Sequence, residues 1–432
     1  LYLQDNVPLQ SPAFFNHNGL WWSSFNANVS RMEVIKGAGT ALYGSGAVAA
    51  TVNILSADVA SSPEASAGML LGEDEYRKLQ VSYSSPLNQQ QGIRVSAANV
   101  HSDGWREHIG VDKSEINLRH EYELSGDERI VTSIILSDLS QEMASRLTDE
   151  QFATDRTDSG LSDAVLAIDP QRETQYARVS VQWDKTVNDQ YYSIIPYLRY
   201  RTNDYTATWN KNMPKVASKV RTFGLLGLAN ITFDESSDFT VGVDIELTEG
   251  DQLSFQPLDI TTTGWGADTY LEGEKFYDDT TRYVAASPYL QYQRQIAEKW
   301  QLTFGARYDY AEYQFDNHLG LIGDIGHGKI SLADRDDNFS HLSPKASLIY
   351  QATDNSSVYW RYANSFRLPT AGSLYHLTTK DSGEAKAVDP EVSDTYEMGY
   401  KGNFERLTVD GAIYYMDVDD GIVHAYNQHG QR

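Results

Sequence analysis

The segment WQLTFGARYDY, residues 300–310, alternates between apolar and polar side chains, which is typical of a β-strand with two different faces. Large apolar side chains share one face: Trp300, Leu302, Phe304, Ala306, Tyr308 and Tyr310. Polar side chains share the other: Gln301, Thr303, Arg307 and Asp309. The segment has about the length of 9–11 residues that a tilted strand needs to cross a bilayer.

The same alternation recurs from about residue 65 onward, for example in 173–183, 239–247 and 393–401. In 239–247, Phe239, Val243 and Leu247 oppose Thr240 and Glu246. Counting such segments predicts roughly 15–16 strands in this chain.

The connections between these strands alternate in length. Short polar turns are predicted near residues 84–91, 125–128, 184–190, 234–238, 295–299, 352–355 and 403–405. Long segments are predicted at residues 102–112, 139–172, 202–219, 250–280, 314–341 and 365–392. A β-barrel with short turns on one side of a membrane and long loops on the other produces this pattern. A soluble Greek-key sandwich would not be expected to maintain it. The predicted fold class is therefore an all-β transmembrane barrel.

Composition narrows the class of protein. No run approaches the roughly 18 apolar residues of a transmembrane helix. The chain has no Cys, which excludes disulfides and thiolate metal sites, and its net charge of −25 argues against nucleic-acid binding. Its 28 Tyr and 8 Trp suit membrane–water interfaces, although a Tyr-rich secreted sandwich is an alternative from composition alone.

The first 60 residues lack long alternation and contain one dense motif, RMEVIKGAGTALYGSGAVAATVNIL, at residues 31–55. Two short strands, Met32–Ile35 and Thr51–Leu55, flank a segment of small residues in which glycines permit close backbone approach. We expect residues 1–60 to form a compact globular unit and residues 61–432 to form the barrel.

The motif resembles the end of the plug domain of TonB-dependent outer-membrane receptors. The matching residues are Arg31, Glu33, Val34, Ile35, Lys36, Gly37, Leu42, Tyr43, Gly44, Ala47, Val52, Asn53 and Ile54. The chain departs from the family pattern at Ala38, where Pro is common, and at Ala49 and Ala50, where Gly-Gly is usual.

Further segments resemble the same family. LYLQDNVPLQ (1–10) is similar to a plug strand with its turn, and FRLPTAGSLY (366–375), DPEVSDTYEMGYKG (389–402) and YYMDVDDGIV (414–423) are similar to late barrel strands. The resemblance implies a barrel of about 22 antiparallel strands with a small α+β plug in its lumen. On this reading the chain is a fragment that lacks the N-terminal part of the plug and the C-terminal barrel strands.

The resemblance also implies a function. A ferric siderophore would be imported across the bacterial outer membrane, driven by TonB and its inner-membrane energising complex, within a shell of outer-membrane lipid. The chelate would be cargo, and no cofactor, resident metal or nucleic-acid partner is expected. No catalytic motif is present, so the chain is not expected to be an enzyme. Haem, cobalamin or a glycan are alternative cargoes, and a passive porin or adhesive barrel is an alternative of another class.

Candidate ligand contacts lie where the plug apex should meet the outer loops. Paired indole rings suit a planar chelate, and cations offset an anionic one. The plug candidates are His17, Trp21, Trp22 and Phe25, and the loop candidates are Trp209, Trp265, Arg367, Tyr375 and His376. Packing of the plug against the wall, or a place in the interfacial belt, is the alternative for each aromatic side chain.

Two polar groups carry more specific hypotheses. His376 lies where haem receptors of the family place an axial ligand, so it is the candidate for a haem alternative. Family members hold the plug by pairing its arginines with barrel glutamates, which makes an Arg31–Glu397 pair the hypothesis here. The residues predicted for the plug motif and its contact with the barrel are Arg31, Glu33, Lys36, Gly37, Tyr43, Gly44, Asn53 and Glu397.

Overall fold

The computed structural model describes residues 1–22, 26–262, 267–378 and 388–421. Its N-terminal elements are β1 (Tyr2–Gln4), β2 (Val7–Pro8), η1 (Pro12–Phe14), α1 (Gly19–Trp22), β3 (Arg31–Lys36), α2 (Thr40–Tyr43) and β4 (Ala50–Leu55). The elements that follow are β5 (Glu64–Leu71), β6 (Arg77–Pro86), β7 (Gln91–Ser102), β8 (Val111–Ser125), β9 (Glu128–Glu142), α3 (Asp149–Thr154), α4 (Asp163–Leu166), β10 (Gln171–Val187), β11 (Gln190–Thr206), β12 (Lys215–Asp234), β13 (Ser237–Phe255), β14 (Ile260–Thr261), β15 (Thr269–Tyr270), β16 (Lys275–Ala297), β17 (Trp300–Asn317), β18 (Gly323–Gly326), β19 (Lys329–Ser331), β20 (Arg335–Thr353), β21 (Ser356–Arg367), α5 (Ala371–Tyr375), β22 (Glu391–Phe404) and β23 (Leu407–Asp419).

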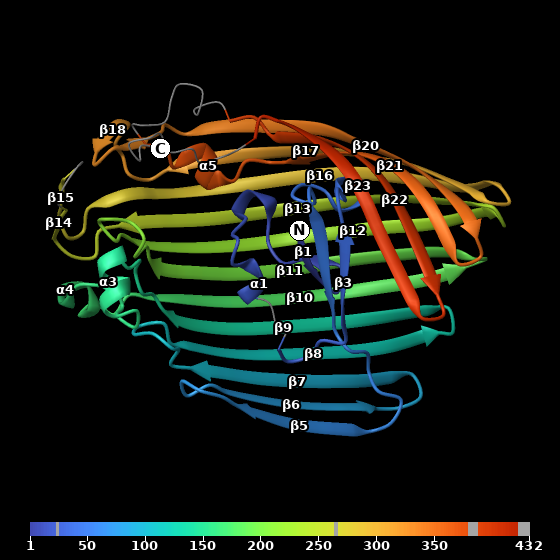
Figure 1. The fold of residues 1–432 in the computed structure, drawn as a ribbon, viewed down its shortest axis with the longest axis horizontal. Helices are drawn as coiled ribbons and strands as arrows, with labels where there is room; N and C mark the ends of the chain where they lie inside the picture. The colour runs from blue at the N-terminus through green and yellow to red at the C-terminus, as the bar shows by residue number, and fades with distance from the viewer. Residues whose placement is uncertain (23–25, 263–266, 379–387, 422–432) are drawn as a thin grey trace.

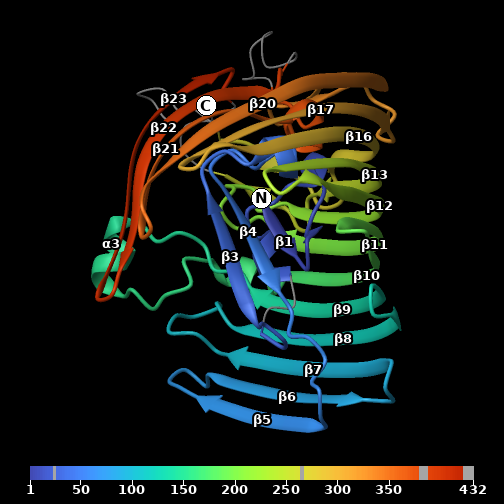
Figure 2. The ribbon, with the colours of Figure 1, turned by 90° about the vertical axis from the view of Figure 1, so that its right-hand side faces the viewer.

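One antiparallel sheet of 15 strands forms the wall of the molecule, in agreement with the predicted strand number. Its strands follow one another in chain order from β5 at one edge to β23 at the other, and the short hairpins β14–β15 and β18–β19 lie outside it. Figure 2 shows the wall curving around the N-terminal strands β1, β3 and β4. The wall is therefore an up-and-down arc that contains the plug on its concave side.

The two faces of the wall have the polarity that the alternation predicts. On β17, Phe304 and Tyr308 are 49% and 46% exposed on the convex face, whereas Arg307 and Asp309 are only 4% and 6% exposed on the concave one. A soluble sheet would bury its apolar face. This wall instead presents apolar side chains outward and polar ones to its interior, which is the arrangement of a membrane barrel.

The loop pattern places all the long connections at one end, where Figure 1 shows α3, α4, α5 and the small hairpins. The short turns join β6–β7, β8–β9, β10–β11, β12–β13, β16–β17, β20–β21 and β22–β23 at the other end, as predicted. Several strands are longer than a bilayer crossing requires, and β16 reaches 23 residues. The predicted loops at 202–219 and 250–280 were therefore too long, because paired strands continue into both of them.

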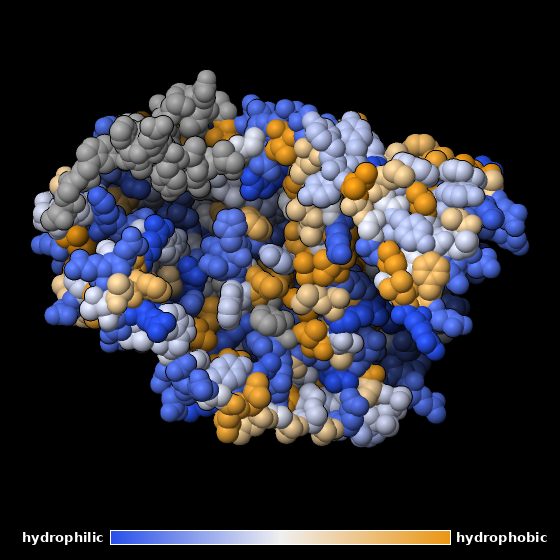
Figure 3. Space-filling model, in the orientation of Figure 1, coloured by the Kyte–Doolittle hydropathy of each residue, from blue (hydrophilic) through white to orange (hydrophobic). Residues whose placement is uncertain are grey.

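The plug contains a four-stranded sheet in the order β2-β1-β4-β3. The two predicted short strands are confirmed as β3 and β4, and they pair antiparallel with Arg31 opposite Leu55. Gly37 and Gly44 have φ angles of 80° and 79°, a left-handed conformation that explains glycine at these turns. Figure 3 shows hydrophobic residues near the centre of this view, and β3 contributes the exposed side chains Met32 and Val34.

Packing between plug and wall forms the principal apolar clusters. The largest joins Ala13 of the plug to wall and loop residues, among them Tyr313, Phe366, Leu374 and Tyr375. Among the residues that the structure describes, no helix combines the length and the apolar character needed to span a bilayer.

Candidate functional site at the plug–wall interface

Arginines of the wall hold the first plug strand by its main chain. Arg178 on β10 is fully buried and donates a hydrogen bond of 2.6 Å to the carbonyl oxygen of Gln4. It also lies 3.4 Å from the Asp5 carboxylate, which in turn accepts hydrogen bonds from the amide and hydroxyl of Ser56. One wall cation thus joins the beginning and the end of the plug.

Two neighbouring arginines on β11 continue this contact. Arg199 donates to the carbonyl oxygen of Pro8 at 2.6 Å and lies 3.4 Å from Glu246 on β13. Arg201 donates to the carbonyl oxygen of Phe14 at 3.3 Å. Because these guanidinium groups bind main-chain carbonyl oxygens, the contacts depend on the course of the plug's main chain and only weakly on the identity of its side chains.

A carboxylate on β8 makes the complementary contact with plug amides. Glu115 accepts hydrogen bonds from the main-chain amides of Asn26 and Ala27, at 2.8 and 3.1 Å, and from the Asn26 side chain at 2.9 Å. Lys113 lies 2.6 Å from Glu115, and both side chains are almost completely buried. This pair fixes the segment that leads from the plug apex to β3.

The glycine-containing turns of the plug motif lie against two more arginines. Arg307 on β17 contacts the carbonyl oxygen of Leu42 at 3.4 Å and pairs with Asp244 at 2.6 Å and Asp309 at 2.9 Å. Arg361 on β21 donates to the carbonyl oxygens of Lys36 and Ala38. These contacts position Gly37 and Gly44 against the wall.

The predicted Arg31–Glu397 pair is wrong. Arg31 pairs with Glu33 at 2.9 Å on an exposed part of the plug. Glu397 instead accepts a hydrogen bond of 2.5 Å from Tyr359. A Cβ added at Gly37 would lie 3.5 Å from the Glu397 carboxylate. Glu397 therefore does lie beside the plug, but near Gly37 and not near Arg31.

The remaining motif residues have structural roles within the plug. Asn53 on β4 and Asn6 exchange hydrogen bonds of 2.9 and 3.2 Å that close the turn after β1. Tyr43 ends α2, and burial, followed by the negative charge of Glu33, raises its pKa. Lys36 contributes its carbonyl oxygen to Arg361.

A pocket of about 520 Å³ lies between the plug and the loop after β21. Its walls include Phe15 and His17 from the plug and Arg367, Thr370 and Ser373 from the loop. Two predicted ligand residues, His17 and Arg367, therefore lie around one cavity. The Phe15 and His17 rings meet edge to face at 5.5 Å, and Arg367 lies 2.8 Å from Glu391.

Helix α1, which carries Trp21, lies near the wall strands β9 and β10. Helix α1 contacts both strands, and its Leu20 packs with Leu9 and Tyr176. Trp21 is 53% exposed, so its indole remains available for a ligand. Trp22 ends the same helix, and Phe25 lies outside the described residues.

The loop candidates separate into different environments. Trp209 is 44% exposed and stacks on Tyr205, whereas Trp265 lies outside the described residues. Tyr375 is 1% exposed, stacks on Phe315 at 4.3 Å and donates to Asp337 at 3.0 Å. The ligand contact predicted for Tyr375 is corrected to a packing role, because its ring is covered on all sides.

His376 has both ring nitrogens in use. Nε2 lies 2.8 Å from Asp279, and Nδ1 lies 3.1 Å from the side-chain nitrogen of Gln252. Since that amide nitrogen only donates, Nδ1 accepts and Nε2 carries the hydrogen that Asp279 binds. In this conformation His376 has no nitrogen left for an axial bond to haem iron.

The sequence did not predict the main anchors of the plug. Arg178, Arg199, Arg307, Arg361 and Glu115 belong to ordinary alternating strands, and nothing in their local sequence distinguishes them. The alternation did predict that Arg178 and Arg307 face the interior of the wall. A charged side chain facing the interior is the signal that could have marked them as plug contacts. The plug atom that each one contacts depends on the fold.

The comparison with known families assigns this architecture. Residues 131–431 match the model of the TonB dependent receptor-like β-barrel, and residues 1–51 match that of the TonB-dependent receptor plug domain. The chain belongs to the TonB-dependent receptors. It is thus part of an outer-membrane β-barrel receptor with a plug, and it is not an enzyme.

Individual relatives of this receptor are distant. The chain is 23% identical, over 428 residues, to the vitamin B12 transporter BtuB of Vibrio vulnificus, covering 98% of the chain and 59% of the relative. It is 26% identical over 172 residues to the ferric-pyoverdine 358 receptor of Pseudomonas putida, which covers 39% of the chain and 18% of the relative.

Solved structures share the fold. The match to the unliganded ferric citrate transporter FecA has a TM-score of 0.79 at 16% identity. It covers 99% of this chain and 62% of the FecA chain. The match to the ferric yersiniabactin uptake receptor FyuA of Yersinia pestis has a TM-score of 0.76 at 15% identity. It covers 97% of this chain and 63% of the FyuA chain. The receptor chain spans about three fifths of the length of BtuB and FecA.

Proposed function

We propose that the receptor containing this chain imports a ferric siderophore across the outer membrane, energised by TonB. The observation that carries this proposal is the pocket of about 520 Å³ between plug and outer loop, whose walls carry Arg367 with its partner Glu391, a histidine and a phenylalanine. Iron chelates of hydroxy acids and catechols are anionic, and catechol rings are flat, so cationic and aromatic side chains suit them.

The plug contacts support gated transport over passive flow. A plug held by wall side chains on β8, β10, β11, β17 and β21 occupies the interior that an open pore would leave to solute. Release of cargo then requires these hydrogen bonds to be broken or rearranged. In this proposal the energising complex pulls on the plug and supplies the work needed to break these hydrogen bonds.

Cobalamin is the second candidate, because the relationship with the vitamin B12 transporter extends over 98% of the chain. Haem has less support, since both nitrogens of His376 have partners within the receptor.

Binding of ferric siderophores, haem and cyanocobalamin to the purified full-length receptor tests the proposal. We expect a ferric chelate to bind. Arg367→Gln should lower the affinity for an anionic chelate by roughly tenfold or more, because a charge-assisted hydrogen bond is lost. A matched control is Arg221→Gln, whose partners Glu249 and Asp251 lie on the wall. Binding of cyanocobalamin alone, or uptake that persists without TonB, would contradict it.

A further inference from the structure

A second hollow lies at the long-loop end, between the β7–β8 loop (103–110) and the β9–β10 loop (143–170). Its volume is about 570 Å³, and its walls carry the carboxylates Asp103, Glu107, Asp112 and Glu142 with the single guanidinium of Arg106. The excess of negative charge favours a cation in this hollow.

His108 is held in this hollow by one ring nitrogen. Its Nε2 lies 2.9 Å from the carbonyl oxygen of Pro170. A carbonyl oxygen only accepts, so Nε2 carries the hydrogen, and the neutral ring has its lone pair on Nδ1. Nδ1 lies 3.7 Å from a carboxylate oxygen of Glu142, which is too long for a hydrogen bond. Two electron-pair donors therefore face each other with space for a cation between them.

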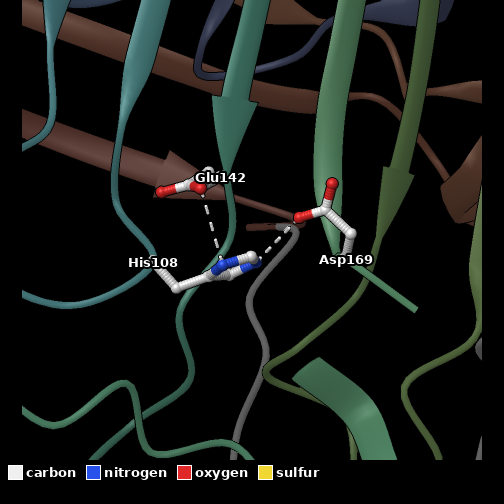
Figure 4. A group of neighbouring side chains, drawn as sticks. All are labelled: His108, Glu142 and Asp169. Carbon is white, nitrogen blue, oxygen red and sulfur yellow. Dashed lines mark ion pairs between the residues drawn. The ribbon is translucent and has the colours of Figure 1, made fainter. Parts of the chain in front are cut away.

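Figure 4 shows Glu142 beside one ring nitrogen of His108 and Asp169 beside the other. The other oxygen of Glu142 accepts a hydrogen bond of 2.9 Å from the Gly110 amide, which directs the free oxygen toward His108. An Asp169 oxygen lies 3.9 Å from the other ring nitrogen, Nε2, and one ligand atom from each of the three residues lies within 4.8 Å of the others. To reach an ion held by Nδ1 and Glu142 with metal–ligand bonds of about 2.0–2.2 Å, the exposed Asp169 side chain has to rotate from the Nε2 side of the ring toward Nδ1.

We propose that His108, Glu142 and Asp169 bind one divalent transition-metal ion, for which Zn²⁺ is the best-matched probe. One imidazole with two carboxylates suits zinc, and solvent takes the fourth position of a tetrahedron. The hydrogen bond from Nε2 to Pro170 is the outer-shell contact that metal-binding imidazoles usually make, and it orients Nδ1 toward the ion.

The bound ion would join two loops that already touch. Arg106 donates to the carbonyl oxygens of Asp158 and Ser145 at 2.6 and 2.7 Å, and the Glu107 amide donates to Thr157 at 2.9 Å. His108 belongs to the first loop, whereas Glu142 and Asp169 flank the second, which contains α3 and α4. Metal binding therefore restrains the second loop at both of its ends.

His101 provides a matched control within the same hollow. Its Nδ1 lies 2.7 Å from Asp112 and its Nε2 lies 3.3 Å from Asp103, so both nitrogens have an acceptor at hydrogen-bond or ion-pair distance. Each nitrogen of His101 thus has a carboxylate oxygen within 3.3 Å, whereas Nδ1 of His108 lies 3.7 Å from Glu142. His101→Asn should leave metal binding unchanged.

The experiment titrates the full-length receptor with Zn²⁺ against a chromophoric chelator. His108→Asn suits the test, because asparagine tolerates the left-handed backbone at this position, where φ is 59°. We expect the wild type and His101→Asn to bind one more equivalent of zinc than His108→Asn or Glu142→Gln. Affinity should fall by more than about 100-fold, because loss of an outer-shell partner alone costs about 10- to 100-fold.

A second measurement follows the loop itself. Zinc should slow proteolysis within residues 143–170 of the wild type and of His101→Asn, and should have no effect on His108→Asn. Equal zinc stoichiometry and affinity in wild type and His108→Asn would overturn the proposal. Zinc without imidazole in its coordination shell, measured by X-ray absorption, would also overturn it.

Discussion

At the scale of single residues, the plug is held by wall side chains that bind its main chain. Arg178, Arg199 and Arg361 donate to plug carbonyl oxygens, and Glu115 accepts from plug amides. A pair between side chains, such as Arg31 with Glu397, was the natural expectation from sequence. It was wrong because every residue has a main-chain carbonyl, so the sequence does not show which carbonyl an arginine binds. The alternation predicts only that the charged side chain faces inward.

Glu115 provides the first prediction at this scale. Glu115→Ala removes the acceptor of three plug hydrogen bonds and leaves the buried Lys113 without that carboxylate. We expect a loss of about 3–5 kcal/mol, the usual cost of breaking a buried ion pair on one side. Equilibrium denaturation of the plug, followed by tryptophan fluorescence, measures it. Lys113→Ala with Glu115→Ala should cost less than Glu115→Ala alone, and a larger loss in the double variant would contradict the argument.

Gly44 and Gly46 form a natural pair for the second prediction. Both have positive φ, 79° and 86°, so Ala introduces backbone strain at each position. A Cβ at Gly44 would lie 2.9 Å from the Arg307 guanidinium, whereas a Cβ at Gly46 meets nothing within 4 Å. Gly44→Ala should therefore lower the thermal midpoint of the plug more than Gly46→Ala does. Equal midpoints would show that Arg307 is not held against this turn.

At the scale of elements, period-2 alternation predicted the strands because a strand has only two faces. Phe304 and Arg307 lie on the faces expected for them. Strand length was predicted less well, since polar residues such as Asp251 and Asp278 continue the ladder beyond the apolar band. Helix α5 was not predicted, and its five residues are fixed by the packing of Leu374 and Tyr375 into the largest cluster.

Tyr375 connects α5 to the wall and gives a pH-dependent prediction. Burial, followed by the charge of Asp337 and its hydrogen bond, raises the pKa of Tyr375 well above the ordinary value near 10. The folded state then keeps a proton that the unfolded chain releases, so this contribution to stability is present below about pH 10 and decreases as the pH rises above it.

Tyr375→Phe removes this dependence together with the hydrogen bond to Asp337. The variant should lose about 1 kcal/mol at pH 8. The difference in thermal midpoint between wild type and variant should shrink between pH 9 and pH 11. A constant difference over this range would show that the hydroxyl does not titrate differently in the folded receptor.

At the scale of the whole molecule, the contacts between plug and wall are distributed over the arc. Arg178 on β10 holds β1, while Arg361 on β21 holds the turn after β3, so the plug is attached on opposite sides of its own sheet. A pull applied at one point of the plug meets only part of this network at a time. For the import proposed above, we therefore expect stepwise rearrangement of the plug and not its removal as a rigid body.

The last prediction follows from this distribution. In the full-length receptor, Arg178→Gln combined with Arg361→Gln removes anchors on both sides while the wall sheet keeps its main-chain ladder. We expect greater entry of a large antibiotic that wild-type receptor excludes, and easier unfolding of the plug by urea. Arg221→Gln combined with Arg282→Gln is the matched control, because these arginines pair with Glu249, Asp251 and Asp316 on the wall. If both double variants leak equally, the wall is responsible, and the hydrogen bonds from Arg178 and Arg361 to the plug do not control passage.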